Sequence, residues 1–74
     1  MMIVEGMKVR FVPGFNDSKI LSPAERKAAS ITGTIIYINW EHKCFWVEFD
    51  CGGTKQREAF KFVDIGTAVT VCGH

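Results

Sequence analysis

The chain has 74 residues, of which 47% are hydrophobic and 23% are charged, and its formal net charge is +1. These values exclude an intrinsically disordered tail, which needs low hydrophobicity and high net charge, and a polybasic arm that binds DNA mainly through charge. The length allows one small domain over 1–74, whose thin core must come from aromatic and β-branched side chains.

The first part of the chain predicts a strand followed by a long loop. Residues 7–12 alternate between apolar and polar, which is typical of a half-buried strand. The side chains on its apolar face are Met7, Val9 and Phe11. Ser22 is suited to cap a helix, and Glu25 completes a capping box three residues later. We therefore expect one short helix or 3₁₀ turn over 22–29, inside a loop that spans 13–31.

A hairpin between residues 33 and 50 is the strongest pattern in the sequence. Residues 33–39 are rich in β-branched and aromatic side chains, residues 44–50 alternate between apolar and polar, and a polar turn joins the two runs. In the second run, Phe45, Val47 and Phe49 are predicted to face the core. The residues predicted to face out are Cys44, Trp46, Glu48 and Asp50.

The first strand of this hairpin is apolar on both faces. Strict alternation places Ile35 and Tyr37 on one face and Ile36 and Ile38 on the other. Two explanations are open: both faces are covered, as in a small barrel, or a β-bulge exchanges the faces midway.

Two further strands are predicted after a tight turn at 51–54. Residues 55–62 form the fourth strand, a 3₁₀ turn follows over 63–66, and residues 67–72 form the fifth strand. Glu58 is in phase with Phe60 and Phe62, so we expect it at the start of its strand, outside the core. The sequence thus predicts an all-β domain of five short strands.

This plan, with its long first loop and its 3₁₀ turn before the last strand, resembles an SH3-like barrel. Residues 6–11 and 33–38 are similar to strands of KOW-type small barrels. The resemblance implies a five-stranded barrel, and the KOW relatives imply binding to nucleic acid or to the ribosome. True SH3 domains imply binding to proline-rich peptides, but the loop holds only Phe15 as an aromatic for such a groove.

A second resemblance is to small uncharacterised proteins of bacterial phages and prophages. The segments that carry it are 38–42, 45–49 and 57–62. The likeness covers about residues 33–63 and brings no catalytic residues. It implies an accessory protein of the bacterial host cytosol that binds or inhibits a host or phage protein, including a component of a defence system.

The cysteines and histidines do not indicate a catalytic or metal site. The three cysteines are an odd number without CxxC spacing, which favours free thiols. The alternative is a zinc site, whose ligands would be Cys44, Cys51, Cys72 and His74, with His42 in reserve. A barrel this small fills its interior with side chains. We therefore expect no enzyme activity, no cofactor, no metal and no membrane segment.

Outward-facing aromatic and basic residues form the candidate binding surface. The predicted partner-binding residues are Tyr37, Trp40, His42, Lys43, Trp46, Lys55 and Arg57. Trp, Tyr and Arg dominate protein–protein hot spots, and aromatic plus basic residues also suit single-stranded nucleic acid. Alternatively, Trp46 covers the core beneath the long loop.

These observations predict a cytoplasmic binding module without catalysis, with a protein as its partner. The first alternative is a nucleic-acid-binding barrel of the KOW type, and the near-zero net charge argues against it. The second alternative is an oligomer, such as a homodimer, that binds a small anionic ligand between its subunits.

Overall fold

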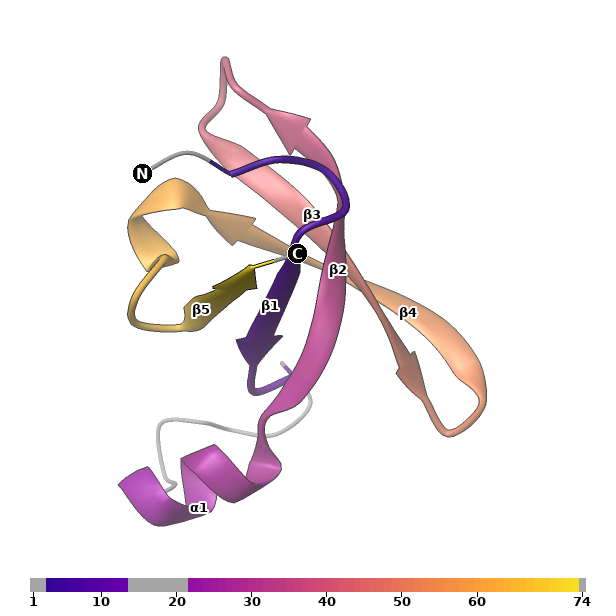
Figure 1. The fold of residues 1–74 in the computed structure, drawn as a ribbon, viewed down its shortest axis with the longest axis vertical. Coiled ribbons are helices and arrows are strands. Elements are labelled where there is room, and N and C mark those ends of the chain that lie inside the picture. The colour runs from indigo at the N-terminus through magenta and orange to yellow at the C-terminus, as the bar shows by residue number, and fades with distance from the viewer. Residues whose placement is uncertain (1–2, 14–21, 74) are drawn as a thin grey trace.

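The computed structural model describes residues 3–13 and 22–73, and its fold is all-β with one short helix (Figure 1). Its elements are β1 (Lys8–Phe11), α1 (Pro23–Ala29), β2 (Ile31–Asn39), β3 (Cys44–Cys51), β4 (Thr54–Lys61), η1 (Phe62–Asp64) and β5 (Val69–Gly73). The five predicted strands are confirmed, and their ends differ from the predicted ones by two residues at most. Residues 14–21 of the predicted loop lie outside the described residues.

The five strands form one antiparallel sheet in the order β4-β3-β2-β1-β5. Strand β2 is the longest, and it pairs with β1 through its first half and with β3 through its second half (Figure 1). Over the described residues, the edge strands β4 and β5 pair with inner strands and not with each other, so the sheet is not closed.

The core lies on the inner face of the bent sheet and joins its two ends. The buried apolar residues are Ile3, Val9, Phe11, Ile35, Ile38, Phe45, Val47, Phe49, Phe60 and Val69. Phe11 of β1 contacts Phe49 of β3 and Phe60 of β4 edge to face, with ring centroids 5.1 and 5.2 Å apart. Aromatic pairs of this geometry stabilise beyond the area they bury, so these contacts hold β1 against the β3–β4 hairpin.

The predicted inward faces are confirmed, with three differences at the margins. Met7 is only half-buried, and Cys44 and Glu48, which were predicted to face out, are also half-buried. The expectation for Glu58 was wrong about its place in the strand, since it lies opposite Val47 in the middle of β4; it is half-buried and is not part of the core. Strand β4 extends beyond the core toward its turn with β3. It therefore begins at Thr54, six residues before Phe60, its one buried residue.

A β-bulge at Ile36 resolves the double apolar character of β2. Ile35 lies opposite Val47 and Tyr37 lies opposite Trp46, so Ile36 is the extra residue between two consecutive pairs. The bulge lets Ile35 and Ile38 both enter the core while Tyr37 turns outward. The second of the two explanations offered by the sequence is therefore correct.

The predicted capping box at the start of α1 is present. The backbone N–H of Glu25 donates to Oγ of Ser22 at 3.2 Å, and the backbone N–H of Ser22 donates to Oε1 of Glu25 at 3.1 Å. Hydrogen bonds from the backbone and then from the side chain of Ser22 lower the pKa of Glu25, because they favour its charged form.

The turn between β2 and β3 holds a residue in an unfavourable backbone conformation. Lys43 has a φ of 55°, which makes it the only described residue other than glycine with a positive φ. The backbone N–H of His42 donates to Oδ1 of Asn39 at 3.0 Å, and the carbonyl of Lys43 accepts from the N–H of Phe62 at 2.9 Å. These hydrogen bonds hold the turn, although a positive φ is sterically unfavourable for a residue with a side chain such as Lys43.

We expect Lys43→Gly to raise the free energy of unfolding by about 0.5–1 kcal/mol. Glycine adopts a positive φ without a steric cost, which stabilises the folded state. This stabilisation exceeds the loss that comes from the greater conformational entropy of glycine in the unfolded chain. Urea unfolding at equilibrium measures the change. His42→Gly is the matched control, because His42 lies in the same turn without a positive φ, and it should destabilise the protein. A Lys43→Gly variant no more stable than the wild type would contradict the prediction.

Candidate functional site

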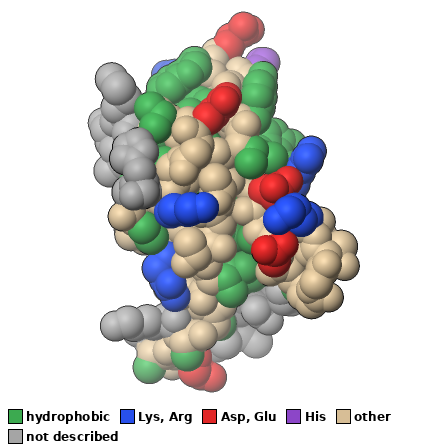
Figure 2. Space-filling model, turned by 45° about the vertical axis from the view of Figure 1, so that its right-hand side comes forward, with side chains coloured by type: hydrophobic (Ala, Val, Ile, Leu, Met, Phe, Trp, Pro, Cys, Tyr) green, Lys and Arg blue, Asp and Glu red, His purple; other side chains and the backbone are tan. Residues whose placement is uncertain are grey.

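The candidate site lies on the outer face of the sheet, opposite the core. Strand pairing brings its side chains into rows: Tyr37, Trp46 and Ala59 form one row, and Thr34, Glu48 and Arg57 form the next. A third row joins Asp50 to Lys55, and Thr34 also pairs with Lys8 of β1. Figure 2 shows acidic and basic side chains alternating down this side of the molecule below a hydrophobic area.

A pocket of about 360 Å³ opens on this face, lined by Ile36, Tyr37, Trp46 and Arg57. Tyr37 is 51% exposed and Trp46 is 41% exposed. Ala59, the β4 neighbour of Trp46, carries only a methyl group, so the indole is not covered from that side. Two large aromatic side chains therefore remain accessible next to a guanidinium group. We call these four lining residues the aromatic pocket.

The bulge in β2 creates this pocket. Without it, alternation from the buried Ile35 would turn Tyr37 toward the core and Ile38 toward solvent. With it, Tyr37 faces the same side as Trp46, its partner on β3, and Ile36 adds an apolar wall. Bulges often redirect a side chain in this way next to functional sites.

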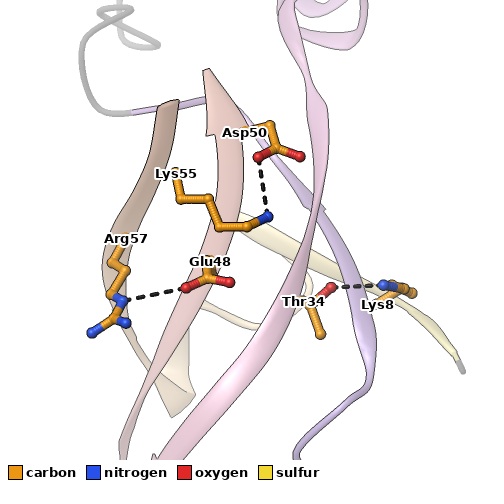
Figure 3. Close-up of polar contacts among 6 residues, drawn as sticks. All are labelled: Lys8, Thr34, Glu48, Asp50, Lys55 and Arg57. Atoms are coloured by element: carbon orange, nitrogen blue, oxygen red, sulfur yellow. Dashed lines mark hydrogen bonds and ion pairs between the residues drawn. The ribbon is translucent and has the colours of Figure 1, made fainter. Parts of the chain in front are cut away.

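Two ion pairs, one exposed and one with the half-buried Glu48, order the charges beside the pocket (Figure 3). Nε of Arg57 lies 3.5 Å from Oε2 of Glu48, and Nζ of Lys55 lies 3.1 Å from Oδ1 of Asp50. Exposed pairs contribute only about 0–1 kcal/mol each to stability. Their effect here is to neutralise both acidic side chains of this face and to hold Arg57 at the rim of the pocket.

Strand β1 adds two cations that sequence reasoning missed, Lys8 and Arg10, here called the β1 basic pair. Nζ of Lys8 donates to Oγ1 of Thr34 at 2.7 Å (Figure 3), and Arg10 donates to Oγ1 of Thr32 at 3.1 Å. Arg10 also donates to Oγ of Ser30 at 2.8 Å and to its carbonyl at 3.3 Å. Neither cation forms an ion pair with a carboxylate of the described residues.

The seven residues predicted as a binding site fall into separate areas. Tyr37, Trp46 and Arg57 line the aromatic pocket, and Lys55 lies two residue pairs beyond Arg57, toward the β3–β4 turn. Sequence reasoning missed Ile36 as a lining residue, because the alternation pattern left its face undecided.

The other three predicted residues, Trp40, His42 and Lys43, lie in the β2–β3 turn and do not line the pocket. The indole of Trp40 is 57% exposed and packs edge to face on Phe62, with the centroids 5.4 Å apart. This contact directs Trp40 toward η1, and Trp40 does not share the pocket with Trp46.

The three cysteines are free thiols. Cys44 and Cys51 are the first and last residues of the eight-residue strand β3, so they lie too far apart to share a metal ion. His74, the other proposed zinc ligand, lies outside the described residues. Among the residues that are described, no group of three or more His, Cys, Asp or Glu side chains could hold a metal ion.

Comparison with known proteins does not assign the chain to a family. No family model, no curated protein and no solved structure matches it. Within the described part of the chain, no helix combines the length and the apolarity that crossing a lipid bilayer requires.

Proposed function

We propose that this protein is a non-catalytic binding module that holds a protein partner at its aromatic pocket. The observation that carries the proposal is the Tyr37–Trp46 cross-strand pair, exposed beside Arg57 around a pocket of about 360 Å³. Trp, Tyr and Arg are the residues that most often dominate binding energy in protein interfaces. Here all three meet at one site.

The energy available at the pocket fits such a role. Covering the exposed half of one large aromatic side chain removes about 100 Å² from water, which contributes about 2.5 kcal/mol. That is the range of a binding hot spot. The four lining residues combine no nucleophile with a general base, so the chemistry of the pocket supports binding rather than catalysis.

The proposed architecture is an SH3-like barrel. Supporting this proposal are the strand order β4-β3-β2-β1-β5, the long connection after β1 and the 3₁₀ turn η1 before β5. From the resemblance over residues 33–63 to small phage and prophage proteins, we propose an accessory protein that acts on a host or phage protein in the bacterial cytosol.

We expect Trp46→Ala to abolish capture of the partner while the protein stays folded. The substitution removes one wall of the pocket, but it leaves the buried face of β3 unchanged. The measurement is affinity capture from bacterial host lysate with quantitative mass spectrometry, alongside far-ultraviolet circular dichroism.

Trp40→Ala is the matched control, because it removes an equally large exposed indole from outside the pocket. Proteins retained by the wild type and by Trp40→Ala, but lost with Trp46→Ala, would support the proposal. Retention that depends equally on both tryptophans, or on Trp40 alone, would place the binding surface elsewhere. Unfolding of Trp46→Ala would show that Trp46 is a structural residue.

A further inference from the structure

We infer that the partner presents an extended acidic peptide, with an apolar side chain in the aromatic pocket and carboxylates on the β1 basic pair. The inference rests on the proposed function, since the pocket is the same site. It adds the chemical class of the ligand and the direction in which it runs, from the pocket along β2 toward β1.

The distribution of charge on the outer face supports an acidic ligand. On the described strands this face carries five basic and two acidic side chains: Lys8, Arg10, Lys55, Arg57, Lys61, Glu48 and Asp50. Both carboxylates are paired with bases of β4. The positive charge on β1 is therefore not compensated within the described residues, and a ligand of opposite charge would complete it.

The hydrogen bonds of the β1 basic pair hold the cations in place without exhausting their donors. The ammonium group of Lys8 has three donors and uses one on Thr34. Arg10 has five donors, and its bonds to Thr32 and Ser30 come from Nη1 and Nη2 only. The remaining N–H groups are available for charge-assisted bonds to carboxylates.

The spacing of these groups matches an extended peptide. Lys8 lies opposite Thr34 and Arg10 opposite Thr32, so the two cations are about 7 Å apart, like alternate side chains of a strand. Tyr37 lies three residues beyond Thr34 on β2, about 10 Å along the strand. Two acidic residues, two positions apart and beginning three or four positions from an apolar anchor, would reach both cations.

The same face suits a peptide better than a nucleic acid. Glu48 is 26% exposed in its side chain and lies beside Thr34, between the pocket and Lys8. Because this carboxylate and Asp50 already pair with Arg57 and Lys55, a continuous phosphate backbone would find these two β4 cations occupied, whereas a peptide can place its charges opposite β1 alone. The net charge of +1 also provides little of the general attraction on which phosphate binding depends.

Selection from a random dodecapeptide display library tests the inference directly. The wild-type protein should enrich peptides with an aliphatic or aromatic residue and with Asp or Glu three to six positions away. Trp46→Ala should abolish enrichment. The double variant Lys8→Gln/Arg10→Gln should keep the apolar preference and lose the acidic one. Lys43→Gln removes one charge from the β2–β3 turn, outside the pocket and away from β1, and should keep both.

A synthetic peptide with the enriched sequence then gives the magnitude. We expect its Kd to rise roughly five- to tenfold in Lys8→Gln/Arg10→Gln, as for the loss of two exposed ion pairs. The control variant Lys43→Gln should change the Kd by less than about twofold. Circular dichroism checks the fold of each variant, and Lys8→Gln alone replaces the double variant if the latter unfolds.

The outcomes separate the two proposals. Enriched peptides without acidic residues, or an acidic preference unchanged in Lys8→Gln/Arg10→Gln, would overturn the inference and leave the pocket as a protein-binding site. No enrichment by the wild type would overturn the inference alone, and the capture experiment with Trp46→Ala and Trp40→Ala would then decide the proposed function. A single-stranded oligothymidylate bound more tightly than any selected peptide at low salt would overturn both, and would favour the nucleic-acid alternative.

Discussion

Gly33→Ala is expected to lower the free energy of unfolding by about 1–3 kcal/mol or more, which is the range for overpacked cores. A methyl group at Gly33 would overlap Cγ1 of Val47, and would lie 3.0 Å from the carbonyl oxygen of Glu48 and 3.0 Å from Cε1 of Phe11. One of these neighbours is backbone and another is a buried ring, so neither can easily move. For a domain of this size such a loss is a large part of the total stability.

A double-mutant cycle tests the cause of this loss. Val47→Ala removes the side chain that the new methyl group would strike, although it leaves a cavity of its own. In the Gly33→Ala/Val47→Ala protein the two changes should cost clearly less than the sum of the single variants, because the methyl group occupies part of the vacated space. Urea unfolding curves for the four proteins provide the comparison. Strict additivity would show that the overlap with Val47 is not responsible.

The second large effect is expected for Phe11→Ala, at about 3–5 kcal/mol. Phe11 is 2% exposed. Its ring lies on the same inner face as Phe49 and Phe60 and contacts both of them across the core. Truncation leaves a cavity between β1 and the β3–β4 hairpin, where no other described ring pair joins the two. We expect the variant to be largely unfolded at 37 °C, as measured by thermal circular dichroism.

Two variants calibrate this prediction. Phe11→Leu keeps most of the apolar volume and should cost clearly less than Phe11→Ala. Val63→Ala removes apolar atoms from a residue that is 81% exposed, and should change stability by no more than about 0.5 kcal/mol. If Phe11→Ala proved as mild as Val63→Ala, the two ends of the sheet would not depend on this ring for their contact.

Local patterns in the sequence were sufficient to predict the strands. Alternation identified Val9, Phe11, Phe45 and Val47 as inward residues, because each strand has one buried face and a period of two. The pattern could not decide β2, where apolar residues occupy both faces. A bulge depends on how two strands pair, and pairing is not visible in the alternation of one strand.

The candidate site was predictable in part for the same reason. Trp46 could be identified because it alternates with the inward residues Phe45 and Val47. Tyr37 and Arg57 were added because they are an aromatic and a basic residue on neighbouring strands. Trp40 was grouped with them because it is close in sequence, yet its ring packs on Phe62 in a distant part of the chain. Alternation over residues 7–12 puts Lys8 on the face opposite Met7, Val9 and Phe11, but its place beside Thr34 depends on the register between β1 and β2.

The bulge at Ile36 also affects how sequences of this kind should be compared. Deleting the single codon for Ile36 would restore regular alternation, with Ile35 and Ile38 still inward and Tyr37 still opposite Trp46. The core would be kept, while the pocket would lose its apolar wall. Among related chains, gain or loss of this site would therefore register as a one-residue gap in an alignment, at a position where no core residue changes.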